Sequence, residues 1–111
     1  MDYPGVSVLT PTYNRKNFIE LCIFNLKNQN YPLNKLEWFL LDDSKTPYTV
    51  EKIEYIKQKI APIKFKYVHE KVKQEIGTKR NKLVKNCSYK ICIMMDDDDI
   101  YQHTYIQKSI L

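Results

Sequence analysis

The chain has 111 residues, of which 43% are hydrophobic and 28% are charged, a globular balance that excludes an intrinsically disordered protein. The length suffices for one small domain or for one half of a larger one. The formal net charge of +5 suits an anionic ligand, and the excess of lysine over arginine is typical of an AT-rich genome, cellular or viral.

The three cysteines form neither a CxxC motif nor a metal-ligand spacing. Cys22 and Cys92 fall on expected core faces, where a free cysteine acts as a small hydrophobic residue. The N-terminal stretch MDYPGVSVLT lacks the features of a leader, and no apolar run approaches the roughly 20 residues of a membrane span. We therefore expect a soluble chain in the reducing cytoplasm.

Strands and helices are predicted to alternate along the chain. Residues 6–10 (VSVLT) form the expected first strand. Apolar residues at helical spacing, from Phe18 to Leu26, predict a helix that Asn17 caps. The continuous apolar run at 36–41 (LEWFLL) predicts a strand buried on both faces of a parallel sheet.

A polar loop containing Pro47 leads to a second helix, whose apolar residues recur from Val50 to Ile60. Residues 64–68 (KFKYV) alternate between charged and apolar side chains, as an exposed edge strand does.

The third helix is expected after Gly77, with Thr78 as its cap. Its predicted apolar face carries Leu83, Val84 and Cys87. Residues 90–95 (KICIMM) predict the fourth strand, and a last helical stretch begins near Gln102.

This alternation predicts a parallel α/β sheet with right-handed crossovers, Rossmann-like, with about four strands flanked by helices. In such a sheet the carboxyl ends of the strands lie along one edge, where ligands bind. The segments PTYNR, DDS and DDDD each follow a predicted strand, so they should converge on one crevice.

Four consecutive carboxylates, Asp96 to Asp99, follow the fourth strand directly. Such carboxylates are oxygen ligands for a hard divalent cation, Mn or Mg, which would offset their mutual repulsion. Asp98 or Asp99 could instead cap the helix near Gln102, and we expect one of the four acids to do so. An EF-hand is unsupported because the spaced ligands and the central glycine are missing.

The other two clusters suit a nucleoside. Asp42 and Asp43 could accept from a base N–H or a ribose hydroxyl, although a turn with a helix cap is a serious alternative. Tyr13 could stack on a base, an interaction worth about 1–3 kcal/mol. Arg80 presents a fork of donors to a base carbonyl or a phosphate, and its alternative is a surface ion pair.

Other polar residues receive less weight. Arg15 is the second of two arginines and ranks below Arg80. His103 lies near the acids, where an exposed or structural histidine is the favoured interpretation, and His69 is assigned no role. The lysines of residues 71–82 are expected on a solvated face, with diphosphate binding as the alternative.

Four segments, VSVLTPTYNR, LEWFLLDDS, GTKRNKLVKN and ICIMMDDDDIY, in this order and spacing resemble the nucleotide-binding half of family 2 glycosyltransferases with the GT-A fold. The resemblance covers essentially the whole chain. It implies a nucleotide-sugar donor, with a UDP-sugar favoured, and inverting transfer of the sugar to an acceptor hydroxyl.

The resemblance also implies roles for individual residues. Pro11 and Tyr13 match the segment that lines the nucleoside pocket, and Asp43, with Asp42, matches the acid that contacts the uracil or ribose. Arg80 matches the arginine that reaches the base or the phosphates.

The acid run matches the family's metal-binding DxD motif. Asp96 and Asp98 match the ends of this motif, with Asp97 between them and a register uncertain by one residue. Asp98 is favoured as the metal ligand and Asp96 as the ribose or sugar contact.

The chain departs from the family pattern where it has KNCSYK before the fourth strand and His103 in place of a frequent proline. The family's acceptor site and its catalytic base, an acid on a later segment, would lie beyond Leu111. We therefore expect a single donor-binding domain, 1–111, truncated before the acceptor-binding half.

Rival interpretations remain open. A nucleotidyltransferase would use the same crevice, but such enzymes commonly have a Gly-rich loop after the first strand, and residues 10–17 contain no glycine. A catalytically silent nucleotide-sugar-binding module would be separated from an active enzyme by whether the donor is hydrolysed. A nucleic-acid partner is not expected, because no motif is visible and the acidic strand tip would repel phosphate.

Overall fold

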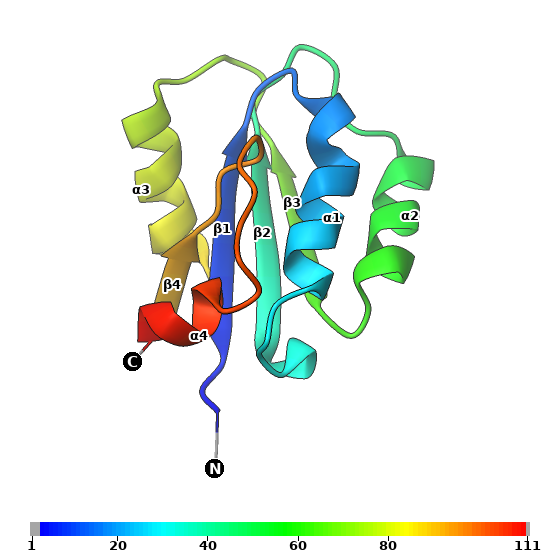
Figure 1. Cartoon of the computed structure of the whole chain (residues 1–111). Coiled ribbons are helices and arrows are strands. Elements are labelled where there is room, and N and C mark those ends of the chain that lie inside the picture. The colour runs from blue at the N-terminus through cyan, green and yellow to red at the C-terminus, as the bar shows by residue number, and fades with distance from the viewer. Residues whose placement is uncertain (1–2, 111) are drawn as a thin grey trace.

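The computed structural model describes residues 3–110 as one parallel sheet between two layers of helices (Figure 1). The strands are β1 (Val6–Thr12), β2 (Leu36–Asp42), β3 (Lys64–His69) and β4 (Ile91–Met94). The helices are α1 (Ile19–Lys27), α2 (Val50–Ile60), α3 (Ile76–Asn86) and α4 (Tyr105–Ile110), with short 3-10 turns at Lys16–Phe18 and Leu33–Lys35.

The strand order is β3-β2-β1-β4, and every neighbouring pair is parallel. All seven residues of β1 and all seven of β2 are buried, as the continuous apolar run of β2 predicted. The position of β3 at an edge of the sheet is also confirmed. The expected fold class, a four-stranded parallel α/β sheet, is therefore the observed one.

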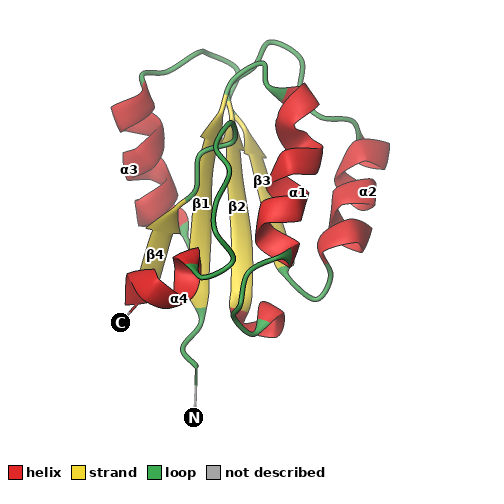
Figure 2. Cartoon of the chain, in the orientation of Figure 1, coloured by secondary structure: helices red, strands yellow, loops and turns green. Residues whose placement is uncertain are grey.

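Alternation along the strands divides the core between the two faces of the sheet. Helices cover both faces, with α3 on one and α1, α2 and α4 on the other (Figure 2). The larger cluster joins β1 and β2 to α1, α2 and α4 around Trp38, Ile56 and Ile106. The smaller cluster consists of Leu9, Phe39, Leu41 and Leu83 and lies beneath α3. Cys22 packs in the first cluster and Cys92 against the second, which confirms both as core-side residues.

Two predicted helix starts are wrong. A 3-10 turn precedes α1, so Phe18 rather than Asn17 occupies the cap position, where no side-chain cap bond is found among the described residues. Helix α3 begins at Ile76, two residues before Thr78, and follows Glu75. Both helices are therefore fixed by packing of their apolar faces rather than by a capping side chain.

The predicted apolar face of α3 is also partly wrong. Val84 is 55% exposed, whereas Leu83 is fully buried and Lys79, one helical turn earlier, is 4% exposed. Residues four apart share one side of a helix, so the buried stripe runs through Lys79 and Leu83 instead. The helix is therefore rotated so that the Lys79 side chain is buried beside the carboxyl ends of β1 and β2.

After β4 the chain continues as an irregular segment that loops over the face of the sheet on which α1 lies and then turns back to α4, which lies beside β4 and β1 (Figure 1). Helix α4 begins at Tyr105 and, over the part that the structure describes, has no acidic residue in its first turn. The expectation that an acid of the Asp96–Asp99 run caps this helix is therefore wrong. Across residues 3–110, no helix is both long and apolar enough to span a membrane.

Candidate functional site

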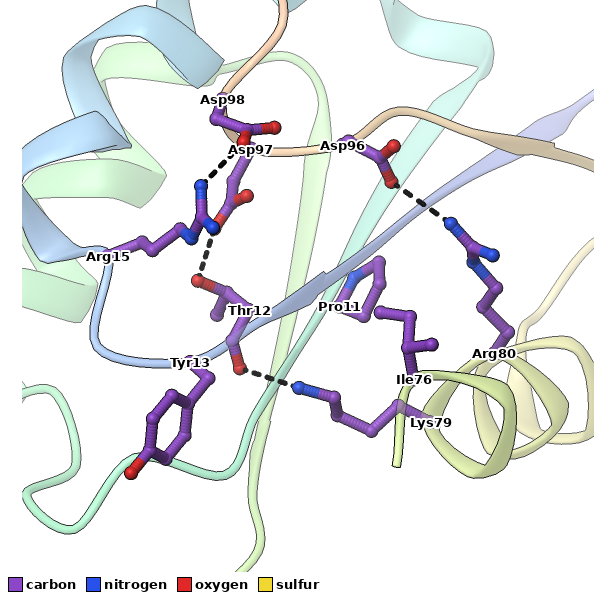
Figure 3. Close-up of a pocket in the computed structure, with 10 residues that line it drawn as sticks. All are labelled: Pro11, Thr12, Tyr13, Arg15, Ile76, Lys79, Arg80, Asp96, Asp97 and Asp98. Carbon is purple, nitrogen blue, oxygen red and sulfur yellow. Dashed lines mark hydrogen bonds and ion pairs between the residues drawn. The ribbon is translucent and has the colours of Figure 1, made fainter. Parts of the chain in front are cut away.

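The strand order creates a crevice between the carboxyl ends of β1 and β4. The chain leaves β1 toward β2 on one side, while β4 pairs with β1 on the other side. Such a reversal is the switch point at which open parallel sheets bind ligands. A cavity of about 250 Å³ lies there (Figure 3). It is lined by Pro11, Thr12, Tyr13, Arg15, Ile76, Lys79, Arg80, Asp96, Asp97 and Asp98.

The first three acids of the run differ in their surroundings. Met95 continues along β1 by donating its N–H to the carbonyl of Leu9 at 3.0 Å, which delivers Asp96–Asp98 to the crevice. Asp97 is 7% exposed and accepts a hydrogen bond of 2.6 Å from the Thr12 hydroxyl. Burial raises the pKa of Asp97 above its ordinary value, although the Thr12 hydrogen bond opposes this shift.

Both arginines of the chain face the acid run (Figure 3). Arg15 Nη1 lies 2.6 Å from Asp98 Oδ2, and this hydrogen bond raises the pKa of the guanidinium. Arg80 Nη2 lies 3.7 Å from Asp96 Oδ1. All four side chains are between 39% and 46% exposed, so water screens these pairs and other ions can replace them.

A third cationic side chain, that of Lys79, lies deeper, at the end of the cavity nearer Tyr13. Lys79 Nζ is 2.9 Å from Asp43 Oδ1, and both side chains are almost completely buried. The other Asp43 oxygen accepts from the backbone N–H of Gln74 at 2.6 Å. Lys79 Nζ and Lys73 Nζ lie 6.0 and 4.5 Å from the centre of the Tyr13 ring.

Asp42 points away from this crevice. Its two carboxylate oxygens accept from Ser44 and, at 2.7 Å, from the Tyr67 hydroxyl. Successive residues of an extended chain point to opposite faces, so Asp42 turns toward Tyr67 while Asp43 turns toward α3. Asp42 is fully buried in this network, which accounts for it as a structural acid at the end of β2.

The structure brings most of the predicted site residues together. Pro11, Tyr13, Arg80, Asp96, Asp97 and Asp98 line one cavity, whereas Asp42 and Asp43 lie outside its lining. Thr12 and Ile76 also line it and were not singled out from the sequence, and Arg15 contributes more than its low rank implied. Lys79 lines it as well, so the expectation that the lysines of residues 71–82 lie on a solvated face is wrong for this buried lysine.

The two histidines lie outside the lining. The His103 side chain is exposed, and its backbone carbonyl accepts from the N–H of Asn30. His69 Nε2 is 2.6 Å from the carbonyl of Ser44.

The acid run has the donor chemistry of a site for a hard cation. Asp96 and Asp98 offer solvent-accessible carboxylate oxygens, the ligands that Mg and Mn prefer. Among residues 3–110, no three His, Cys, Asp or Glu side chains are grouped closely enough to hold a metal by themselves. The residues therefore fit a cation that is bound by one or two carboxylates together with oxygens of a ligand.

A parallel α/β sheet with a charged crevice at its switch point defines a Rossmann-like ligand-binding domain. The chain matches the family model "Glycosyl transferase family 2" over residues 7–110 and belongs to that family.

Curated relatives agree with this assignment. The chain is 27% identical over 86% of its length to GalNAc(5)-diNAcBac-PP-undecaprenol beta-1,3-glucosyltransferase of Campylobacter jejuni. It is 29% identical over 95% of its length to poly(ribitol-phosphate) beta-N-acetylglucosaminyltransferase TarS of Staphylococcus aureus. It spans only 30% of the first relative and 17% of the second.

Solved structures show the same fold. The mannosyltransferase PcManGT of Pyrobaculum calidifontis, in complex with GDP-Man and Mn2+, superposes with a TM-score of 0.83 at 23% identity over 98% of this chain and 32% of its own. S. aureus TarS 1-349 in complex with UDP-GlcNAc gives a TM-score of 0.79 at 23% identity over 96% of this chain and 30% of its own. These neighbours confirm the GT-A fold.

Proposed function

We propose that this chain is the donor-binding part of a glycosyltransferase and holds a nucleotide-diphosphate sugar, with a UDP-sugar favoured, in the crevice between β1 and β4. The complete reaction would transfer the sugar to an acceptor hydroxyl with inversion. Family membership supports the reaction class. UDP-GlcNAc and GDP-Man in two structural neighbours support a nucleotide-sugar donor.

The observation that carries the proposal is the pairing of the acid run with the two arginines around one cavity. Without a ligand, Arg15 and Arg80 balance the charges of Asp98 and Asp96. A diphosphate would attract the guanidinium groups, and a divalent cation would attract the carboxylates. One ligand and one cation could therefore replace both exposed ion pairs without leaving a charge unmatched.

Individual residues take these roles in the proposal. Asp98 holds the divalent cation, Mn or Mg, with Asp96 as a second ligand or as the ribose or sugar contact. When bound, the cation stabilises charge that develops on the diphosphate leaving group. Asp97, fixed by Thr12 at the floor of the crevice, keeps the two flanking acids directed into it.

On the nucleoside side, Tyr13 stacks on the base and Pro11 lines the pocket wall. Arg80 contacts the phosphates or the base from the second turn of α3. Asp43, which the family resemblance implies as the nucleoside contact, lies behind Lys79. No described residue is assigned to the acceptor site or to the deprotonation of the acceptor.

A thermal-shift panel tests the proposal, with UDP, GDP, ADP or no nucleotide, each in Mn, Mg or EDTA. A ligand at 100 times its Kd adds about 2.7 kcal/mol of stability, which moves the Tm of a domain this size by roughly ten degrees. We expect UDP to stabilise the chain only when the metal is present, and Asp98→Ala to abolish the shift.

Asp99→Ala is the matched control, because Asp99 is an exposed neighbour in the same run and lies outside the cavity lining. It should retain the metal-dependent shift. The absence of a shift with every nucleotide would reject a working donor site in this chain.

A further inference from the structure

Lys79 is a buried cation with an unusual set of contacts. Its side chain is 6% exposed, and its ammonium lies 2.9 Å from Asp43 Oδ1 and 3.4 Å from the backbone carbonyl of Thr12. It occupies the same side of α3 as the fully buried Leu83, so the helix holds it against the sheet. The position of the Lys79 side chain is therefore fixed by its packing and its two hydrogen bonds, unlike that of a solvent-exposed lysine.

The ammonium group has three N–H donors. Two of them have acceptors among the described residues, Asp43 and Thr12, and the third is not matched there. Lys79 also belongs to the cavity lining, whereas Asp43 does not. The group that meets a ligand at this position is therefore the ammonium of Lys79, with Asp43 as its buried counter-ion.

The location of Lys79 separates it from the phosphate end of the cavity. Tyr13, the residue that can stack on a base, has its ring centre 6.0 Å from Lys79 Nζ. Arg15 and Arg80 instead form their ion pairs with Asp98 and Asp96, at the acid run. The ammonium of Lys79 thus lies at the Tyr13 end of the cavity, beside the expected base, with one N–H unmatched among the described residues.

We propose that Lys79 reads the nucleobase by donating to an exocyclic carbonyl oxygen, and that Asp43 is the positioning residue that directs the ammonium. This inference rests on the proposed donor site and names its specificity-determining residue. Bases with a carbonyl at that place, such as uracil, satisfy the ammonium. Bases with an amino group there, such as cytosine, face it with a second donor.

UDP and CDP make the sharpest comparison, because their bases have the same size and differ at the exocyclic group and the adjacent ring nitrogen. Affinities for both are measured by titration calorimetry with Mn present, for the 111-residue chain and its variants. An unmatched buried donor typically costs enough to change affinity tenfold or more. We expect the wild type to bind UDP at least tenfold more tightly than CDP.

Lys79→Met should reduce this ratio to near one, while Asp43→Asn should weaken both nucleotides and largely preserve their ratio. Lys85→Met is the matched control, since Lys85 is an exposed lysine near the end of the same helix. It should leave both affinities unchanged. If Lys79→Met does not fold because Asp43 is left buried without its partner, the double variant Asp43→Asn/Lys79→Met replaces it and should show the same loss of ratio.

Equal weakening of UDP and CDP in the Lys79 variants would overturn the inference and leave Lys79 as a purely structural partner of Asp43. Loss of the ratio in Asp43→Asn alone would assign base reading to the carboxylate instead. Failure of the wild type to bind either nucleotide would be different, because it would reject the donor site itself.

Discussion

Within the acid run, Asp97 is the residue whose charged form is most clearly disfavoured by burial. Because burial raises its pKa, the folded chain holds the proton more tightly than the unfolded chain does. Its contribution to stability is therefore present at acidic pH and is lost as the pH rises through the folded pKa. We predict that Asp97→Asn raises the Tm by a few degrees at pH 7, and that this difference shrinks toward zero near pH 4.

Melting curves of the wild type and variant between pH 4 and pH 7 check this prediction. Asp99→Asn serves as the control, since it removes an exposed carboxylate from the same run. A variant that melts below the wild type at pH 7 would show that the hydrogen bond from Thr12 outweighs the desolvation of Asp97.

At the scale of residues, part of the candidate site could be predicted from the sequence and part could not. Asp96–Asp98 could be placed because a run of acids behind a buried strand must emerge at the carboxyl edge of the sheet. Lys79 could not be singled out, since it stands in a lysine-rich stretch and its burial depends on the exact rotation of α3. The one sequence feature that indicated its burial was its spacing of four residues from Leu83, which places both on the same side of the helix.

At the scale of elements, the irregular segment after β4 is held against α1 by two buried amides. Asn25 donates to the carbonyl of Asp99 at 2.8 Å and accepts from the N–H of Tyr101 at 3.2 Å. Gln29 donates to the carbonyl of Gln102 at 3.0 Å and accepts from the N–H of Ile106 at 3.0 Å. Helix α1 and the turn that follows it, which contains Gln29, thus satisfy backbone groups that no strand pairs, and they fix the segment that follows the acid run.

We predict that Asn25→Ala destabilises the fold by about 2 kcal/mol, because it removes two hydrogen bonds from partly buried backbone groups, each worth about 1 kcal/mol. The same change should weaken the metal-dependent shift with UDP, since the acid run loses an anchor. Urea unfolding and the nucleotide panel measure the two effects separately.

Asn86→Ala is the matched control, as Asn86 is exposed at the end of α3 and its side-chain amide hydrogen-bonds, among the described residues, only to the carbonyl of Lys82. It should change stability by no more than about 0.5 kcal/mol. Equal losses in the two variants would mean that the amide contacts of Asn25 contribute little.

Elements were easier to predict than their ends. The alternation of strands and helices, and the edge position of β3, followed from periodicity in apolar and charged residues. The starts of α1 and α3 did not, because the helices begin at Ile19 and Ile76 without the capping patterns expected at Asn17 and Thr78. The passage of residues 96–104 over the face of the sheet also lacked a local signal, since its partners, Asn25 and Gln29, are some 70 residues away.

At the scale of the whole molecule, both hydrophobic clusters depend on the same two strands. Leu40 of β2 belongs to the larger cluster, while Phe39 and Leu41 belong to the smaller one. Loss of either cluster would expose one face of β1 and β2 to water. We therefore expect the described part of the chain to unfold as one cooperative unit.

Trp38, the single tryptophan of the chain, provides a probe for this cooperativity. Its side chain is 1% exposed, its indole N–H donates to Thr10 Oγ1 at 2.9 Å, and its ring centre is 5.1 Å from that of Phe65. We predict that urea shifts its emission to longer wavelength in a single transition that coincides with the loss of far-ultraviolet circular dichroism. Fluorescence that changes first would show that the face covered by α1, α2 and α4 opens while the smaller cluster persists, because Trp38 belongs to the larger cluster.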